Sequence, residues 1–347
     1  MVVLRRCRPF LALVLLLGTA LGAKGQIAGL SSLDVLDMPV TARTAALGLD
    51  YLPLFDNDIS IAIDNPSFID QRFNRQLSLN YVNLFSGANF GAVSYGFHTE
   101  KFGDFVVGMR FDGYGRFEGY TEEEVPTGSF FAADYVASLG WGMCIDSNFR
   151  IGVNFKPVLS QYDVYTAFAI ALDMAASYVS TNKAFAATLM GRNAGAQILT
   201  FDGTTERTPF ELSAALSYKL ENAPFRFFFA ATELQRWNLR YNDPLNPTEV
   251  FDPYTGEIIA EKPLTGILDN AARHTVFGVE LSIQNAFFAR VGYSYRQTAE
   301  MHGISNINFS GFSYGIGIRK PKFDFAFSRN NYHLGQAPNY LSLSFKI

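Results

Sequence analysis

The chain has 347 residues, of which 48% are hydrophobic and 15% aromatic, and its formal net charge is -4. An acidic chain is a poor candidate for binding nucleic acid, so we expect no nucleic-acid partner. The four histidines lack the spacing of metal ligands, and Cys144 is the only cysteine beyond the N-terminal 25 residues. The sequence therefore predicts no internal disulfide, no metal site and no cofactor.

Residues 1–25 have the features of a cleaved secretory signal. Three arginines precede a short apolar run at Leu11–Leu17, and Ala23–Gly25 resembles a small-residue cleavage site. The apolar run is too short to span a bilayer as a helix. We expect cleavage after Gly25 or, as the alternative, after Gly22. Because four cationic residues and no acidic residue precede position 26, cleavage lowers the formal charge from -4 to -8.

Residues 26–75 lack the alternation of barrel strands, and we interpret them as a separate N-terminal segment. Thr41–Leu47 is suited to a short helix, and Asn65-Pro66 is typical of the start of a turn. We expect this segment to plug or line the periplasmic half of a lumen.

Residues 76–347 contain fourteen runs in which apolar residues alternate with polar or small ones. Period-two alternation is the pattern of a half-buried β-strand. An even number of strands is what single-chain bacterial outer-membrane barrels have. The short run 196–201 is either a loop segment or an extension of the preceding strand. The runs are 76–85, 89–98, 102–112, 131–145, 149–160, 166–180, 184–192, 210–221, 225–240, 274–284, 286–297, 309–319, 322–330 and 339–347.

The connections between the runs favour a membrane barrel over a soluble β-sandwich, which alternation alone does not distinguish. Every second connection is short, whereas most of the others are long, at 113–130, 193–209, 241–273 and 298–308. Outer-membrane barrels have short periplasmic turns and longer extracellular loops. The predicted fold class is therefore all-β: a transmembrane antiparallel barrel of about 14 strands with a small N-terminal plug-like segment.

The last run reaches the final residue, with Leu341, Leu343, Phe345 and Ile347 on one face. A terminal strand must pair with the first strand to leave no open edge in lipid. This run also resembles the C-terminal β-signal that the barrel-assembly machinery reads, although that signal commonly ends in Phe. We therefore expect outer-membrane lipid and, during biogenesis, the assembly machinery as partners.

Two short matches to catalytic serine motifs fit strands and turns better than active sites. Gly311–Gly315 reads GFSYG, a G-x-S-x-G pattern, but Ser313 lies within unbroken alternation and not at a strand-to-helix turn. Ser180–Lys183 matches S-x-x-K, but it falls on a tight turn and no K-T-G motif accompanies it. The sequence predicts a non-enzymatic protein without catalytic residues.

Charged residues on the inward face of the predicted barrel carry both signs. We expect them to pair across strands and stiffen the barrel, with an ion-selective pore as the alternative. These residues are Arg110, Arg150, Lys156, Asp173, Glu211, Lys219, Glu280, Arg290, Arg296 and Asp324.

The predicted loops 113–129 and 241–273 are acidic, and four prolines stiffen the second one. Long insertions of this kind are commonly functional, so we expect partner docking here, with a merely solvated acidic rim as the alternative. The candidate docking residues are Glu122, Glu123, Glu124, Asp243, Glu249, Asp252, Tyr254 and Glu257.

Four short motifs in residues 34–70 carry a family resemblance. They are Ala42-Arg43, Ala46-Leu47-Gly48, Asp56-Asn57-Asp58 and Asn65-Pro66. These motifs, with Arg43, Gly48, Asn65 and Pro66 as candidate family residues, resemble the N-terminal segment of FadL-like barrels. More narrowly, they resemble the PorV/PorQ branch of the Bacteroidota type IX secretion system. That branch usually has Gly after Ala-Leu-Gly and often Ala after Asn-Pro, where this chain has Leu49 and Ser67.

The resemblance implies a protein in the outer membrane of a Gram-negative, Bacteroidota-type bacterium. Such a protein would dock surface components, PorZ-like together with PorU and PorV, for cargo processing and attachment. The alternative is a FadL-type transporter of hydrophobic small molecules, which needs a continuous apolar pocket and a lateral opening. The inward Gly, Ser and charged residues favour docking, although the N-terminal segment could supply an apolar lining.

Overall fold

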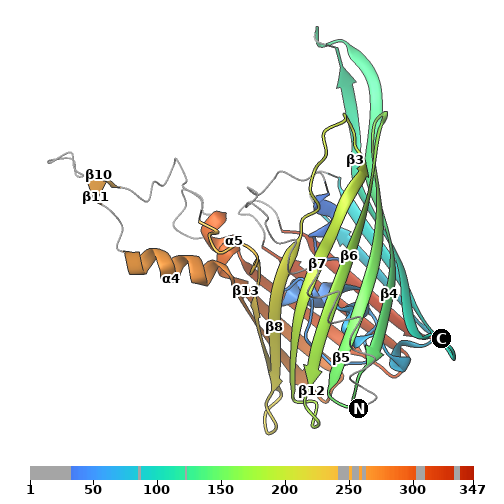
Figure 1. The fold of residues 1–347 in the computed structure, drawn as a ribbon, viewed down its shortest axis with the longest axis vertical. Coiled ribbons are helices and arrows are strands. Elements are labelled where there is room, and N and C mark those ends of the chain that lie inside the picture. Colours follow the sequence, from blue (N-terminus) through green and yellow to red (C-terminus); the bar gives the residue numbers. More distant parts are fainter. Residues whose placement is uncertain are drawn as a thin grey trace, which may run out of the picture. The chain divides into compact units, whose positions relative to one another are not determined.

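The computed structural model describes residues 33–84, 87–121, 123–240, 250–251, 258–259, 263–301, 309–331 and 337–347. Within these residues, fourteen antiparallel strands form a closed barrel, and β10 and β11 form a separate two-stranded sheet (Figure 1). The strands are β1 (Gln76–Asn83), β2 (Asn89–Thr99), β3 (Gly103–Tyr120), β4 (Pro126–Cys144), β5 (Phe149–Tyr162), β6 (Tyr165–Val179), β7 (Phe185–Leu199), β8 (Glu211–Lys219), β9 (Phe225–Ala231), β10 (Val250–Phe251), β11 (Ile258–Ile259), β12 (Thr275–Ile283), β13 (Phe287–Ser294), β14 (Phe312–Arg319), β15 (Phe323–Asn330) and β16 (Asn339–Lys346).

The barrel closes where its first and last strands pair. β1 and β16 are in register from Gln76 opposite Lys346 to Asn83 opposite Asn339. Closure gives the backbone groups of both terminal strands a partner, which a sheet in lipid requires because hydrocarbon offers no hydrogen bonds. The predicted fourteen-stranded all-β barrel is thereby confirmed.

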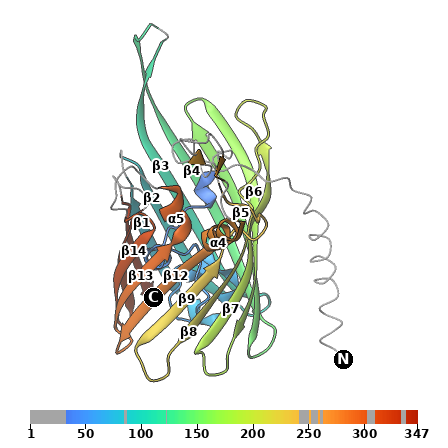
Figure 2. The same cartoon turned by 90° about the vertical axis from the view of Figure 1, so that its left-hand side faces the viewer.

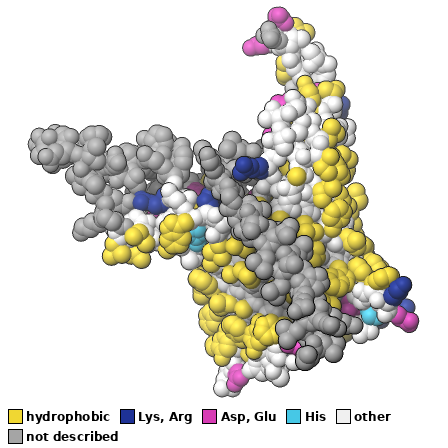
Figure 3. Space-filling view, in the orientation of Figure 1, with side chains coloured by type: hydrophobic (Ala, Val, Ile, Leu, Met, Phe, Trp, Pro, Cys, Tyr) yellow, Lys and Arg dark blue, Asp and Glu magenta, His cyan; other side chains and the backbone are white. Residues whose placement is uncertain are grey.

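The outer wall carries the apolar residues and the lumen carries the small and polar ones. Phe277 and Val291 point outward and are exposed, whereas Glu280, Arg290 and Ser313 point inward and are buried. Apolar side chains cover much of the visible outer wall (Figure 3). An exposed apolar surface of this extent indicates contact with lipid.

The barrel has two different rims. The turn rim is the end where the connections at 100–102, 145–148, 180–184, 220–224, 284–286 and 320–322 reverse the chain. The loop rim is the opposite end. β3 and β4 continue beyond the loop rim as a long hairpin (Figures 1 and 2). Since outer-membrane barrels keep their short turns on the periplasmic side, we expect the turn rim to be the periplasmic one.

Several predicted loops and strand ends are wrong. The loop expected at 113–130 is mostly the β3–β4 hairpin, whose pairing continues to Tyr120 opposite Pro126 through two register shifts. Its glycines and bulges interrupt the alternation, which hid the strands in the sequence. The run 225–240 ends as a strand at Ala231, and the extension of the strand before 196–201 reaches Leu199.

Two helices lie on the loop rim where the sequence predicted a loop and the end of a strand. α4 (Pro263–Arg273) occupies the end of the predicted loop 241–273, and α5 (Tyr295–Glu300) ends the run expected at 286–297. Arg296 therefore lies on α5 and pairs with Glu233 and Glu300, not in the lumen. No helix in the described ranges is long and apolar enough to cross a membrane.

The described part of the N-terminal segment, residues 33–75, packs inside the barrel (Figure 2). Its elements are η1 (Asp34–Leu36), α2 (Ala42–Ala46), α3 (Ser60–Asp64), η2 (Pro66–Phe68) and η3 (Gln71–Phe73). Thr41 caps α2 by accepting a hydrogen bond from the Thr44 backbone, which matches the short helix expected there. Leu47, Leu52, Ile59 and Ile61 are fully buried in one cluster with wall residues Val106, Met190 and Phe228.

Inward glycines allow the segment to approach the wall closely. A Cβ atom at Gly292 would lie 2.2 Å from the Leu47 carbonyl carbon, and one at Gly152 would lie 2.2 Å from that of Pro66. Backbone atoms cannot move aside as a flexible side chain can. These positions therefore need glycine because the segment occupies the lumen.

We expect Gly292→Ala to destabilise the folded barrel by roughly 1–3 kcal/mol, because its methyl group would push Leu47 from the wall. Gly91→Ala is the matched control, since the nearest atom to its Cβ would be the Asn80 oxygen at 3.8 Å. The temperature at which the folded band converts to the unfolded band in gel electrophoresis measures the effect. Equal temperatures for both variants would contradict this packing.

Candidate functional site

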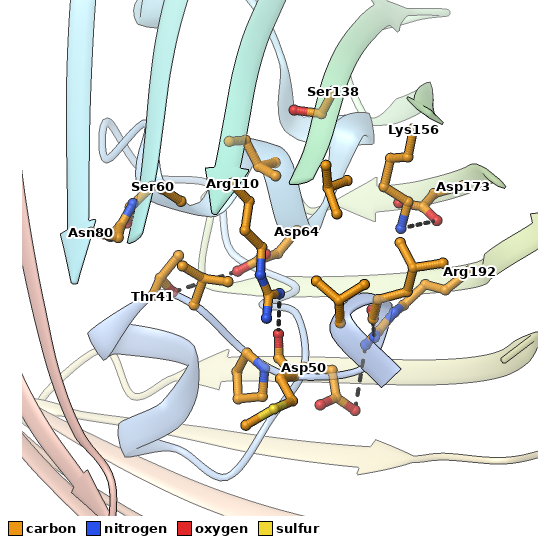
Figure 4. Close-up of a pocket in the computed structure, with 18 of the residues that line it drawn as sticks. Thr41, Asp50, Ser60, Asp64, Asn80, Arg110, Ser138, Lys156, Asp173 and Arg192 are labelled. Carbon is orange, nitrogen blue, oxygen red and sulfur yellow. Dashed lines mark hydrogen bonds and ion pairs between the residues drawn. The ribbon is translucent and has the colours of Figure 1, made fainter. Parts of the chain in front are cut away.

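A cavity lies in the lumen between the N-terminal segment and the wall formed by β1–β7 (Figure 4). The empty space between its lining residues is about 740 Å³, which includes open solvent. Apolar and charged side chains both line it, a combination that is common in small-molecule binding pockets. The cavity is therefore the candidate functional site.

The apolar part of the lining comes largely from the N-terminal segment. Val35 and Leu36 of η1 pack against Val136 of β4, and Val40 packs against Phe90 of β2. Met38, Pro39 and Ile63 also line the cavity. The inward face of the strands is too polar to form such a surface alone, so the segment provides it.

Three cations line the cavity, each held by carboxylates. Arg110 Nε lies 2.7 Å from Asp112, and its Nη1 donates to the Met38 carbonyl at 2.8 Å. Lys156 Nζ lies 2.8 Å from Asp173. These contacts fix the positive groups at the cavity wall, where they can face a polar end of a bound molecule.

Arg192 is the third cation, and it joins the wall to the segment. Its guanidinium lies 3.4 Å from Asp50 on the segment and 3.7 Å from Glu211 on β8. The guanidinium also donates to the Leu36 carbonyl at 3.4 Å (Figure 4). The inward charges thus bind the segment to the wall as well as pairing across strands.

A β-bulge between β6 and β7 shapes this side of the cavity. The register shifts between Leu172 and Met174, and Asn193 adopts a positive φ of 56°. The Asn193 backbone donates to Asp173 at 2.8 Å, and its side chain donates to the Asp37 carboxylate at 3.0 Å. The extra residue therefore turns polar groups inward to hold the segment next to η1.

Asp64, at the end of α3, faces the cavity on the lumenal segment. Its carboxylate accepts a hydrogen bond from the Thr41 hydroxyl at 3.5 Å (Figure 4). Burial deep in the barrel raises the pKa of Asp64 to about 7, and Asp50 adds to this while Arg192 and Arg110 oppose it. The carboxyl therefore changes charge near neutral pH, because burial disfavours the ionised form.

A buried ion-pair cluster lies in the lumen on the turn-rim side of the cavity. Arg43 is fully buried and lies 2.7 Å from Asp56 and 3.0 Å from Glu280 of β12. Arg319 contacts Asp56 from β14, and Arg290 contacts Glu280 from β13, at 2.8 Å and 2.7 Å. Removing one member of such a buried cluster leaves unpaired charges, which is strongly destabilising.

The four candidate family residues lie in contacts between the segment and the wall, outside the lining of the main cavity. Arg43 belongs to the ion-pair cluster, and Gly48 has a positive φ of 67° beside Ser313 of β14. Asn65 donates to the Leu52 carbonyl at 3.1 Å and caps the turn that starts at Pro66. The contacts observed for these four residues hold the segment against the wall.

The other candidate residues lie at the surface or beyond the described part of the chain. Glu123 and Glu124 are exposed at the tip of the β3–β4 hairpin. The residues of the C-terminal run lie on β16, with Leu341 and Phe345 exposed on the outer wall, or just after it at Ile347. The candidates outside the described residues are Glu122, Asp243, Glu249, Asp252, Tyr254 and Glu257.

Neither serine motif forms a catalytic arrangement in its local structure. Ser313 lies within β14 and donates to the Ala46 carbonyl at 3.0 Å. Ser180 lies in a turn closed by a hydrogen bond from the Lys183 backbone at 2.8 Å. The described residues contain no cluster of His, Cys, Asp and Glu that could hold a metal ion.

Sequence reasoning did not identify Asp50, Asp64 or Arg192 as cavity residues. Arg192 continues the inward parity of Met190, so alternation could have placed it in the lumen. Asp50 lies outside the helices and strands, and Asp64 ends the five-residue helix α3, which is too short for periodicity to indicate direction. Only the packing of the segment brings them to the cavity.

No family model and no curated protein matches the chain. Solved structures do match, among them the TodX monoaromatic hydrocarbon channel deltaS2 mutant, with a TM-score of 0.53 and 13% identity over 90% of this chain and 100% of that one. The TodX deltaS2S3 mutant has a TM-score of 0.51 and 12% identity over 89% and 99%. A Pseudomonas aeruginosa FadL homologue has a TM-score of 0.46 and 12% identity over 89% and 99%.

The two TodX structures support the barrel fold. The lipid-facing outer wall and the two different rims indicate that this barrel lies in a membrane. The chain is an outer-membrane β-barrel. Barrels of this kind belong to the outer membranes of Gram-negative bacteria.

We expect Asp64 to make the barrel less stable as the pH rises. Its pKa is about 7 in the folded state and about 3.9 in an unfolded chain. Its contribution to stability is therefore complete below about pH 4 and is lost as the pH rises through about 7.

Asp64→Asn removes this titration. Relative to the wild type, the variant should gain roughly 3 kcal/mol in unfolding free energy between pH 4.5 and pH 8. Denaturant unfolding in detergent at the two pH values measures the gain. Asp163→Asn, at an exposed turn, is the control. If both variants gain unfolding free energy equally, or if Asp64→Asn gains none, the raised pKa is not that of Asp64.

Proposed function

We propose that the protein is an outer-membrane channel for small, mainly apolar organic molecules, which bind in the lumenal cavity. The supporting observation is the lining, in which apolar side chains of the N-terminal segment face a few charged groups on the wall. Pockets for small molecules commonly combine an apolar lining with a few placed polar groups. The TodX likeness agrees with this proposal, because TodX is described as a monoaromatic hydrocarbon channel.

The lining also favours a particular kind of ligand. An apolar body would pack against Val35, Met38 and Val136, while a small polar or anionic end would meet Arg110 or Lys156. Their carboxylate partners neutralise most of this charge, so a large polyanion is a poor fit. A monoaromatic hydrocarbon and a medium-chain fatty acid are the two ligand types that follow.

Passage toward the turn rim would require the N-terminal segment to move. The cluster around Arg43 lies in the lumen on that side, with its carboxylate partners on both the segment and the wall. In this proposal the segment is therefore both part of the binding site and the barrier to free diffusion.

Filling the cavity should block uptake. Ala92 is partly exposed to the cavity from β2, so we expect Ala92→Phe to reduce uptake of radiolabelled toluene or decanoate severalfold. Ala137→Phe is the matched control, since Ala137 is exposed on the outer face of β4 and should leave uptake unchanged. Uptake is measured in a Gram-negative host that lacks its own channels for these two compounds.

Both variants are checked for folding by their heat-dependent electrophoretic shift. If the wild-type chain gives no more uptake of toluene or decanoate than the host alone, the channel proposal is rejected. Equal uptake by the two variants would place the path outside this cavity.

The docking role implied by the N-terminal motifs is the second candidate, and the β3–β4 hairpin is the observation that favours it. The hairpin projects beyond the loop rim and exposes Phe117, Tyr120 and Val125 beside its acidic tip (Figure 1). Exposed apolar side chains on a projecting hairpin suit contact with a protein.

If PorZ-, PorU- or PorV-like proteins dock here, replacing residues 116–131 with an Asn-Gly turn should remove them from the purified complex. Affinity purification from outer membranes, followed by mass spectrometry, tests this. An unchanged set of co-purified proteins would exclude the hairpin as their docking site.

A further inference from the structure

Helix α4 has one strongly apolar face that no described residue covers. Leu264, Ile267 and Leu268 are 66%, 55% and 61% exposed. At about 100° per residue these three side chains fall within one arc of the helix, opposite Asp269 and Arg273. A short helix surrounded only by water would not be expected to expose such an apolar surface. What this face contacts depends on the direction in which it points.

The polar face of α4 anchors the helix to the rest of the loop rim. Asp269 accepts hydrogen bonds from the Tyr295 hydroxyl at 2.7 Å and Arg273 at 2.9 Å, and Arg240 lies 3.1 Å away. Asn270 accepts from the Leu239 backbone at 2.8 Å and donates to the Trp237 carbonyl. These contacts hold the C-terminal half of the helix, so they also fix which way the apolar face points.

The helix extends away from the barrel instead of lying on top of it. It stands out sideways in Figure 1 and is seen nearly end-on in Figure 2. In Figure 3 the yellow atoms at this helix lie on its underside, toward the level of the apolar outer wall, and Lys and Arg atoms lie above them. The apolar face is therefore directed toward the side on which the membrane surrounds the barrel.

The height of α4 coincides with a row of outward aromatic residues. The helix ends at Arg273, just before β12, where Phe277 pairs with Phe229 of β9 and Tyr293 of β13. Tyr293 in turn pairs with Phe312 of β14, and their rings lie 4.7 Å apart. Aromatic girdles mark the two membrane–water interfaces of outer-membrane barrels. The helix thus leaves the wall where the outer leaflet meets water.

We propose that α4 is an interfacial helix whose apolar face lies in the outer leaflet beside the barrel. Its occupant is lipid, because the face continues the lipid-facing wall at the level of its aromatic girdle. Amphipathic helices bind membranes in this way, with the apolar face inserted at the boundary of headgroups and acyl chains.

The test measures how deep each face of α4 lies, using the full chain in nanodiscs of phosphatidylcholine and phosphatidylglycerol. With Cys7 and Cys144 replaced by serine, a nitroxide label is placed at Leu268→Cys on the apolar face. The matched control is Thr265→Cys, an exposed position on the same helix outside the apolar arc. Collision rates with oxygen, which concentrates in lipid, and with a water-soluble nickel complex give the depth of each label.

The proposal expects the label at position 268 to collide severalfold more often with oxygen than with nickel, and the label at 265 to show the reverse. In amphipol, without a bilayer, the contrast should disappear. Two labels that are equally accessible to nickel in nanodiscs would overturn the proposal. A label at 268 that is shielded from both reagents, with spin–spin broadening, would overturn it in favour of contact with a second copy of the chain.

Discussion

The absence of water in a bilayer is the constraint from which this structure follows, because each peptide group in the wall must then bond to protein. Pairing of β1 with β16 meets that requirement at the one place where a sheet would have edges. Closure then gives every strand two faces in different environments, with lipid outside and the lumen inside. The outer face is apolar for lipid, and the inner face collects glycine, serine and charged residues.

The polar lumen explains why the N-terminal segment is built as it is. Glu280 and Arg290 would be poorly solvated inside a narrow barrel, and Arg43 completes their pairing from the segment. Inward glycines such as Gly292 leave room for the segment's backbone. The segment and wall are therefore complementary in charge and in shape, and neither would be well packed without the other.

The same arrangement produces the cavity. Where the segment approaches β1–β7 less closely, apolar side chains from η1 and its neighbours face cations that are already paired. A largely apolar surface is thus formed inside a barrel whose own inner wall is polar. In the proposed channel, function depends on contacts between the segment and the wall, and the loop rim adds structures for which we propose contacts with lipid or protein outside the barrel.

The sequence by itself determined the fourteen strands, their inward and outward faces and the rim with the short turns, because alternation and turn residues are local properties. It also placed Ser313 in a strand despite its enzyme-like motif. The cavity, in contrast, depends on packing: Arg43 meets Glu280 across 237 positions, and Asp64 reaches the lining only when the segment enters the lumen. The β3–β4 hairpin and α4 were likewise recognised only in the tertiary structure. Bulges and glycines interrupt the alternation of the hairpin strands, and a proline-rich stretch precedes α4.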